Sequence, residues 1–410
     1  MAHERKRHVL DYYRKLMGYY PIVGIFGHRQ VGKSTFVAAE VDDYRTLDDI
    51  DQLEAAQVDP KKYIQARRVS KSDSHAWTIG VDECQLEPKL FPTLKEWVRI
   101  HKKPGQFVLS GSVRFTSRKA IRESLAGRIG VAELLPFSVS ELQSRPLPDA
   151  VVQLLNCKIF SQDSLRCLLS LRAQRGIQKE LLRYMEQGGL PGLCFLRSEE
   201  LRKSALNQLH DLILSRDLRL VSELKTPLST IKKFLGYIAR NSFEPYNAAE
   251  VRRILGLAPQ TQKVILHALE SVFVIRRIPV PIRKKEMILL EDQFEERVYS
   301  GGLLELQRRL ESAVYRNIRT QFAYRLDQNV VYEVFLTRDG ARIPIVIRSE
   351  GKSLGLIVTT GEKPSLSETR SASSFLRRDG SAKVVYLSKE LIAPQILDDR
   401  SLLCSIYAVI

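Results

Sequence analysis

The stretch FGHRQVGKST, Phe26 to Thr35, constrains the fold of this chain more than any other feature. It contains Gly27, four further residues, and then Gly32, Lys33 and Ser34, which is the spacing of a phosphate-binding loop. Such a loop requires a buried strand before it and a helix after it, because backbone N–H groups and the helix N-terminus hold the phosphate together. The motif therefore predicts an open α/β sheet near the start of the chain.

Both flanks of the loop have the required character. Upstream, YPIVGIF is a short apolar, β-branched run, which is typical of a buried strand in a parallel sheet. Downstream, STFVAAEV contains neither Gly nor Pro and favours a helix. We predict that the loop backbone surrounds the β-phosphate, that Lys33 reaches the β- and γ-phosphates, and that the Ser34 hydroxyl binds Mg²⁺. The alternative is an ordinary glycine turn. The residues expected to contact nucleotide are Gly27, His28, Arg29, Gln30, Val31, Gly32, Lys33, Ser34 and Thr35.

In a second stretch, WTIGVDECQ, the apolar run WTIGV is followed directly by two acids, Asp82 and Glu83. Ligands of open α/β sheets bind at the carboxyl ends of the strands, so Asp82 and Glu83 are expected beside the loop. Asp82 is predicted to hold Mg²⁺ through water, and Glu83 to orient or deprotonate the attacking water. Two acids at a strand end are more often a solvated loop, and their position behind a phosphate loop is what gives them this meaning.

In a third stretch, QFVLSGSVRF, the apolar run is followed by Ser110, Gly111 and Ser112. Ser112 is predicted to sense the γ-phosphate or the attacking water. Arg128 follows in a short turn after a predicted helix. It is the best candidate for an arginine that neutralises charge during hydrolysis, either within the chain or across to a neighbour. An exposed structural arginine is the alternative reading of Arg128.

Length and composition set the class of protein. A chain of 410 residues favours two to three domains. No apolar run approaches about 18 residues and the N-terminus lacks a signal-peptide core, so no membrane span is expected. Five scattered cysteines without a CxxC pair suit a reduced cytoplasm and argue against a disulfide framework or a zinc site. The formal charge of +17 favours phosphate-rich partners, nucleic acid first, although basic charge can also serve solubility alone.

Several stretches together resemble a known family. They are GHRQVGKST, YRTLDD, VDECQLEPKLFPTLKEWV, LSGS, SLAGRIGVAELLPFSVSEL, YMEQGGLPGLCFL and ILSRDL. The chain resembles the AAA-type P-loop ATPases of bacteria and archaea whose C-terminal domain, of unknown function, is itself similar to PD-(D/E)XK nucleases. The resemblance implies Mg²⁺-dependent ATP hydrolysis in the cytoplasm and supplies no biological role. His28 stands where the family commonly has proline. Because this position contributes backbone, the change is expected to be tolerated.

Residues 244–280 predict a helix, a tight turn from Gly256 to Pro259, a second helix and a β-branched strand. This is the layout of a winged helix-turn-helix, with Asn247 placed to cap the first helix. Such a unit can dock on DNA, but it can also be a protein-contact module or a lid over the nucleotide. His210, on an earlier predicted helix, is expected to be solvated. The candidates for nucleic-acid contact are Arg252, Arg253, Lys263, Arg276 and Arg277.

The family's nuclease-like domain implies a glutamate on a helix, an aspartate on one strand and Glu-x-Lys on the next, with the acids binding metal. Glu311 is in place. Pro344 stands at the aspartate position, and Ile357 and Thr359 stand at the glutamate and lysine positions. Isoleucine cannot hold a divalent cation, so we predict a nuclease-shaped domain without nuclease chemistry.

The predicted fold is multidomain α/β. It comprises a P-loop NTPase domain with a parallel sheet (1–145), a helical region (146–240), a winged-helix-like domain (241–285) and a degenerate nuclease-like α/β domain (286–410). The leading hypothesis is an Mg²⁺-dependent ATPase that couples nucleotide state to binding of DNA or a protein partner. The alternative is a slow nucleotide-controlled switch or scaffold, and an ATP-coupled nuclease is the least favoured. AAA-type ATPases often form rings, so homo-oligomerisation depends on whether Arg128 or another arginine reaches a neighbour.

Overall fold

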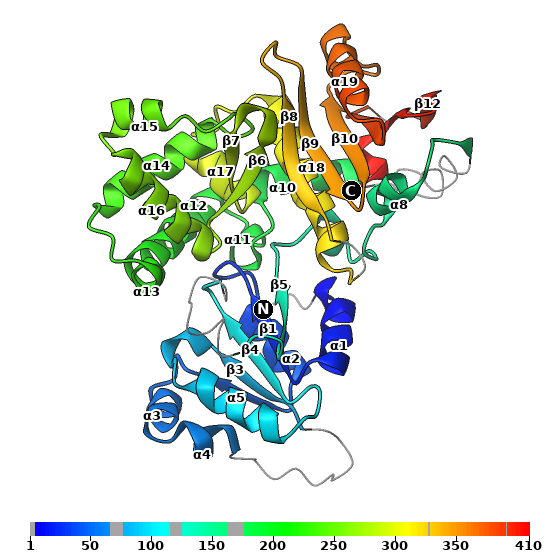
Figure 1. Cartoon of the computed structure of the whole chain (residues 1–410). Helices are drawn as coiled ribbons and strands as arrows, with labels where there is room; N and C mark the ends of the chain where they lie inside the picture. Colours follow the sequence, from blue (N-terminus) through cyan, green and yellow to red (C-terminus); the bar gives the residue numbers. More distant parts are fainter. Residues whose placement is uncertain (1–4, 66–76, 115–124, 163–175, 327–328, 391) are drawn as a thin grey trace.

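The N-terminal domain is built on a parallel sheet, drawn in blue and cyan in Figure 1. The computed structural model describes residues 5–65, 77–114, 125–162, 176–326, 329–390 and 392–410. The sheet has five strands in the order β2-β3-β4-β1-β5, and every neighbouring pair is parallel. The carboxyl ends of β1, β3 and β4 therefore lie side by side at one edge. The strands are β1 (Ile22–Phe26), β2 (Asp43–Thr46), β3 (Ile79–Asp82), β4 (Phe107–Gly111) and β5 (Ile129–Glu133).

Helices cover both faces of this sheet because alternate residues of each strand point to opposite sides. Val23 and Ile25 of β1 belong to one buried apolar cluster together with residues of α1, whereas Ile22 and Phe26 belong to another together with residues of α5. The strands predicted around Tyr20–Phe26, Trp77–Gln85 and Gln106–Phe115 are thus confirmed. The helices are α1 (Val9–Tyr19), α2 (Lys33–Glu40), α3 (Ile50–Val58), α4 (Pro60–Gln65) and α5 (Leu90–Ile100), with a short 3₁₀ turn η1 (Cys84–Leu86).

The helices after the sheet do not form a unit of their own. α8 packs on α18 (Leu306–Ala323) and β10 (Lys352–Thr359) of the C-terminal domain, whereas α14 packs on α15 (Ala248–Leu255) and α17 (Gln293–Tyr299). The predicted boundary between residues 240 and 241 therefore separates helices that pack together. The helical segments are α7 (Val139–Leu142), α8 (Ala150–Asn156), α10 (Ile177–Gln187), α11 (Pro191–Cys194), α12 (Glu199–Leu212), the π-helical η3 (Ile213–Asp217), α13 (Leu218–Val221) and α14 (Leu228–Arg240).

Residues 247–290 follow the predicted order of helix, turn, helix and strand. α15 (Ala248–Leu255) is capped by the Asn247 side chain, which accepts a hydrogen bond from the Glu250 backbone N–H. Gly256 ends it in the left-handed conformation, with φ of 68°, and α16 (Pro259–Ser271) begins with proline in its first turn. β6 (Ile275–Val280) and β7 (Lys285–Leu290) form an antiparallel hairpin around the 3₁₀ turn η4 (Pro281–Arg283). The assignment as a winged helix stays a prediction.

The C-terminal domain is a six-stranded mixed sheet in the order β12-β13-β11-β10-β9-β8. Figure 1 shows α18 and α19 packed against it. Across the described part of the chain, no helix is long and apolar enough to cross a bilayer. The elements are α17 (Gln293–Tyr299), α18 (Leu306–Ala323), β8 (Val331–Leu336), β9 (Arg342–Ser349), β10 (Lys352–Thr359), α19 (Leu366–Arg378), β11 (Ala382–Ser388), β12 (Gln395–Asp398), β13 (Ser401–Ser405) and the 3₁₀ turn η5 (Ile406–Ala408).

Candidate nucleotide-binding site

The phosphate loop connects β1 to α2, as its sequence requires. Gly32 has φ of 96°, a left-handed conformation that favours glycine. A Cβ on Gly27 would lie 2.3 Å from the Leu134 backbone oxygen, so no larger residue fits there. Both glycines of the motif are therefore needed for the path of this backbone.

Lys33 is buried at the N-terminus of α2. Its ammonium donates hydrogen bonds to the backbone oxygens of Gly27, at 3.1 Å, and His28, at 3.0 Å. Burial lowers the pKa of Lys33 from its ordinary value, while Glu83 and Asp82 oppose this shift. A triphosphate at the loop would offer this ammonium charged acceptors, which form stronger hydrogen bonds than carbonyl groups do.

Asp82 is the last residue of β3, and its carboxylate is held from two sides. The Ser110 hydroxyl donates to one carboxylate oxygen at 2.5 Å, and the Tyr44 hydroxyl donates to the other at 2.8 Å. The Ser34 side chain also lies beside the Tyr44 hydroxyl. Ser34 and Asp82 thus converge around one point, which suits a hard cation that prefers oxygen ligands.

Glu83 follows β3 directly and has a left-handed backbone, with φ of 53°. The Gln85 side-chain amide donates a hydrogen bond to the Glu83 carboxylate and lies 3.4 Å from the Ser112 hydroxyl. Burial raises the pKa of Glu83, and the nearby Lys33 opposes this effect. Glu83, Gln85 and Ser112 therefore form one polar group at the carboxyl ends of β3 and β4. The sequence motifs predicted no role for Gln85 or Tyr44, although both residues lie within these motifs.

Arg128 does not lie at this site. It precedes β5, whose first residue Ile129 pairs with Ile22 at the start of β1. The loop follows Phe26 at the other end of β1, about 13 Å away at 3.3 Å per residue. The Arg128 guanidinium instead donates to the Ala126 backbone oxygen at 3.3 Å. The prediction that Arg128 acts within its own chain is therefore wrong, and its action on a neighbouring molecule stays a prediction.

Two other arginines contact the site. Arg29 of the loop forms an ion pair with Asp217 at 3.3 Å, and Arg216 forms one with Asp48 at 2.7 Å. The hydrogen bond to Asp48 raises the pKa of Arg216, and Glu83 adds to the same effect. Arg216 and Asp217 both lie in the π-helical segment η3, and such segments occur frequently at functional sites.

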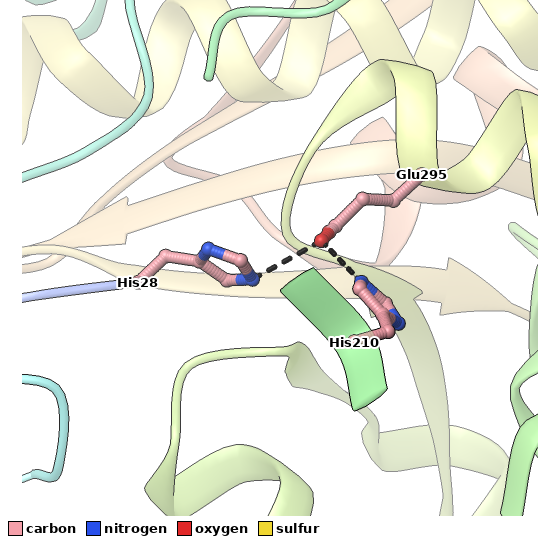
Figure 2. A group of neighbouring side chains, drawn as sticks. All are labelled: His28, His210 and Glu295. Atoms are coloured by element: carbon pink, nitrogen blue, oxygen red, sulfur yellow. Dashed lines mark hydrogen bonds and ion pairs between the residues drawn. The ribbon is translucent and has the colours of Figure 1, made fainter. Parts of the chain in front are cut away.

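A buried polar cluster lies next to the loop (Figure 2). The Nε2 atom of His28 is 3.1 Å from Oε1 of Glu295, and Nε2 of His210 is 2.7 Å from the same oxygen. The prediction that His210 is solvated is wrong, since it is 0% exposed. Burial opposes charge on Glu295, but His28 and His210 hold the pKa of Glu295 below its usual value. Burial likewise opposes charge on His28, and Glu295 raises its pKa.

The exposed basic residues predicted to contact nucleic acid lie on α15, α16 and the hairpin. Arg276 is an exception, because its guanidinium is paired with Glu133 and, at 3.4 Å, with Glu291. The prediction that Arg276 is available to phosphate is therefore wrong. Arg277 forms an ion pair with Glu286 at 2.7 Å. The side chains that remain exposed on the two helices are Arg252, Arg253 and Lys263.

In the C-terminal domain, Glu311 of α18 is 1% exposed. The two terminal nitrogens of Arg342, on β9, donate to its two carboxylate oxygens at 2.9 and 2.6 Å. Pro344 lies on β9, and Ile357 and Thr359 lie buried on β10. Glu311 is thus neutralised by a guanidinium of the same domain.

Comparisons with known proteins agree with a P-loop fold for the N-terminal domain. The family described as "AAA domain" matches residues 19–143, so this part of the chain is similar to AAA-type P-loop domains. A domain of unknown function, DUF8612, matches residues 178–287. The similarity of the C-terminal domain to nucleases stays a prediction.

Two relatives and two solved structures are similar to the chain. The uncharacterized proteins Mb2031c of Mycobacterium bovis and Rv2008c of Mycobacterium tuberculosis are each 23% identical over 85% of this chain and 72% of their own length. A STAND signal-transduction ATPase with a tetratricopeptide repeat sensor, from Pyrococcus horikoshii, matches with a TM-score of 0.22 at 12% identity. This match covers 76% of this chain but only 46% of that structure. AMPPCP-bound DnaA from Aquifex aeolicus matches with a TM-score of 0.25 at 13% identity, over 64% of this chain and 85% of that one. TM-scores this low do not establish a shared overall fold.

Proposed function

We propose that this protein binds ATP with Mg²⁺ at the phosphate loop and hydrolyses it. The observation that carries the proposal is the convergence of Lys33, Asp82 and Glu83 at one edge of a parallel sheet. Lys33 binds the β- and γ-phosphates, and Ser34 and Asp82 hold Mg²⁺, the latter through water. Glu83 accepts a proton from the attacking water or orients it.

The test separates binding from chemistry. Lys33→Ala should abolish ATP binding, whereas the exposed Lys61→Ala in the same domain should bind like wild type. Glu83→Gln should keep ATP bound and slow single-turnover hydrolysis by ~10²-fold or more, with Glu54→Gln on the exposed face of α3 as the matched control. Asp82→Ala should lose Mg²⁺ dependence and activity together. Wild-type ATP affinity in Lys33→Ala would refute the site.

We further propose that nucleotide state is coupled to binding of duplex DNA or a protein partner. The ion pairs of Arg29 with Asp217 and of Arg216 with Asp48 join the nucleotide site to the middle helices. These helices lead into α15 and α16, whose exposed face carries Arg252, Arg253 and Lys263. Duplex DNA should therefore stimulate multiple-turnover phosphate release. Turnover that does not change with DNA, together with no DNA binding at low salt, would contradict this coupling.

The second candidate is a slow nucleotide-controlled switch that acts through protein contacts. It is favoured by Glu83, whose carboxylate is already engaged by Gln85. In this case ATP binds tightly, but phosphate release is negligible with and without DNA. Mass measurement in solution with ADP and with a non-hydrolysable ATP analogue tests whether either state is a homo-oligomer, in which Arg128 could reach a neighbour's site.

A further inference from the structure

The cluster of His28, His210 and Glu295 has the donor set of a metal site. One ring nitrogen of each histidine and one carboxylate oxygen of Glu295 all lie within 4.8 Å of one another. Two ligands at about 2.1 Å from one zinc ion are separated by no more than about 4.2 Å. The separations of 3.1 and 2.7 Å from Glu295 Oε1 meet this limit. The three side chains come from the loop, α12 and α17, and Figure 2 shows the carboxylate between the two imidazoles.

The hydrogen bonds of His28 require a positive species beside its Nε2 atom. Nδ1 lies 2.6 Å from the Arg29 backbone oxygen, which can only accept, so Nδ1 carries the hydrogen. Nε2 of a neutral ring then presents its lone pair to the Glu295 carboxylate, which is also an acceptor. A second proton on His28 or a metal ion would remove this repulsion.

The direction of the contact favours the metal ion. Nε2 of His28 is buried and makes no hydrogen bond, although Glu295 Oε1 is only 3.1 Å away. The oxygen therefore lies off the axis along which an Nε2 hydrogen would point. A zinc ion about 2.1 Å from both atoms cannot lie on the line that joins them. Seen from Nε2, the direction to the ion differs by roughly 40° from the direction to Oε1. The His28–Glu295 contact thus suits a shared metal ion better than a shared proton, whereas the His210–Glu295 contact at 2.7 Å has the geometry of a hydrogen bond that the metal ion would replace.

The surroundings hold the donors in the way that metal ligands are usually held. The other nitrogen of His28 is bonded to a backbone carbonyl, and Nδ1 of His210 lies 2.8 Å from the Tyr299 hydroxyl. The second oxygen of Glu295 accepts from the Asp292 backbone N–H at 3.2 Å. Histidine ligands almost always carry such a partner on their other nitrogen.

We propose that His28, His210 and Glu295 bind one divalent transition-metal ion of the zinc class, with water as a fourth ligand. Imidazole and carboxylate are ligands that zinc accepts, and the scattered cysteines do not bear on a site of this type. On binding, the Nε2 proton of His28 is released to solvent. The hydrogen of His210 moves to Nδ1 and is donated to the Tyr299 hydroxyl. The donors are 0–1% exposed and come from the loop, α12 and α17, so the ion fastens the phosphate loop to these two helices.

The test uses full-length protein without nucleotide, purified without chelators. Elemental analysis should find about one zinc per chain, and Co²⁺ added to the chelated protein should give the visible absorption of a bound, low-symmetry ion. Chelation should lower the Tm, and Zn²⁺ should restore it. Absence of bound metal, of the Co²⁺ spectrum and of a Zn²⁺-dependent Tm shift in wild type would overturn the proposal and leave a proton-bridged ion pair.

Variants assign the ion to this cluster. His210→Gln should lose the metal and the chelator effect, whereas His267→Ala, an exposed histidine on α16, should keep both. Tyr299→Phe, which is nearly isosteric, should fold and bind Co²⁺ with ~10–100-fold lower affinity. Retention of wild-type metal affinity in both His210→Gln and Tyr299→Phe would place the ion elsewhere and refute the site.

Discussion

The Glu311–Arg342 pair makes an asymmetric prediction about the C-terminal domain. The Glu311 side chain is 2% exposed and that of Arg342 is 28% exposed. Removing one partner of a buried ion pair typically costs about 3–5 kcal/mol, because the other charge is left uncompensated. Arg342→Met leaves a carboxylate that is almost completely buried, so the full ~3–5 kcal/mol is expected. Glu311→Gln leaves a guanidinium that water partly reaches, so we expect roughly half of this cost.

The double variant sharpens the prediction. Replacing both residues by apolar ones, in Glu311→Leu with Arg342→Met, removes both charges, and a buried pair replaced in this way is often neutral in stability. We therefore expect the double variant to be more stable than Arg342→Met alone.

Calorimetric unfolding at fixed protein concentration measures these differences. At about 4 °C per kcal/mol for a domain of this size, Arg342→Met should lower the Tm of the C-terminal transition by ~12–20 °C. Neither wild type nor any of these variants should cut DNA or RNA with Mg²⁺ or Mn²⁺, with or without ATP. A double variant that is no more stable than Arg342→Met alone would refute the pairing argument. Metal-dependent cleavage that vanishes in Glu311→Ala would make the chain an ATP-coupled nuclease.

Three further predictions concern the nucleotide site and the basic face, which is the exposed face of α15 and α16 that carries Arg252, Arg253 and Lys263. Because burial raises the pKa of Glu83 and only its carboxylate form accepts a proton, single-turnover hydrolysis should fall on the acid side with an apparent pKa above the ordinary 4.5. An acid limb at or below that value would contradict this role. Arg216→Ala should reduce kcat ~10-fold or more. Its Tm should change little, since exposed ion pairs contribute at most about 1 kcal/mol to stability. Equal kcat in Arg216→Ala and in the exposed control Arg219→Ala would show that Arg216 takes no part in hydrolysis. If the basic face binds nucleic acid, affinity should fall steeply with salt, and Arg252→Glu with Arg253→Glu should weaken binding to all sequences alike and flatten the salt slope.

The nucleotide site was largely predictable because its signals are local. A strand, a glycine loop and a helix occur in one continuous stretch, and Asp82 and Glu83 close another strand of the same sheet. Arg128 was misplaced because a turn between a helix and a strand does not by itself reveal the edge at which it lies. A residue that precedes a parallel strand lies at the amino edge, opposite the loop, and the apolar run IGVAE after Arg128 was the available signal.

The contacts made across the chain were not predictable from sequence patterns. His210 and Glu295 are separated by 85 residues, and His28 is farther still from both, so no periodicity relates them. A histidine on an amphipathic helix usually faces solvent, whereas this one is buried and contacts Glu295 and Tyr299. Arg276 is a similar case, since its partner Glu133 belongs to the N-terminal sheet. Burial and pairing of charged residues therefore had to come from the tertiary structure.

These long-range contacts also bear on how nucleotide binding would reach the rest of the chain. Three consecutive loop residues each meet a different element: His28 contacts Glu295, Arg29 contacts Asp217, and the Gln30 side chain packs where a Cβ on Gly192 would lie. A ligand can shift a conformational equilibrium only if its affinity differs between the states. Triphosphate binding would draw the Lys33 ammonium away from the carbonyls of Gly27 and His28 and set the loop backbone around the phosphates. Any displacement of that backbone moves the side chains of His28 and Arg29 against their partners in α17 and η3. The affinity of the loop for nucleotide therefore differs between arrangements of these helices.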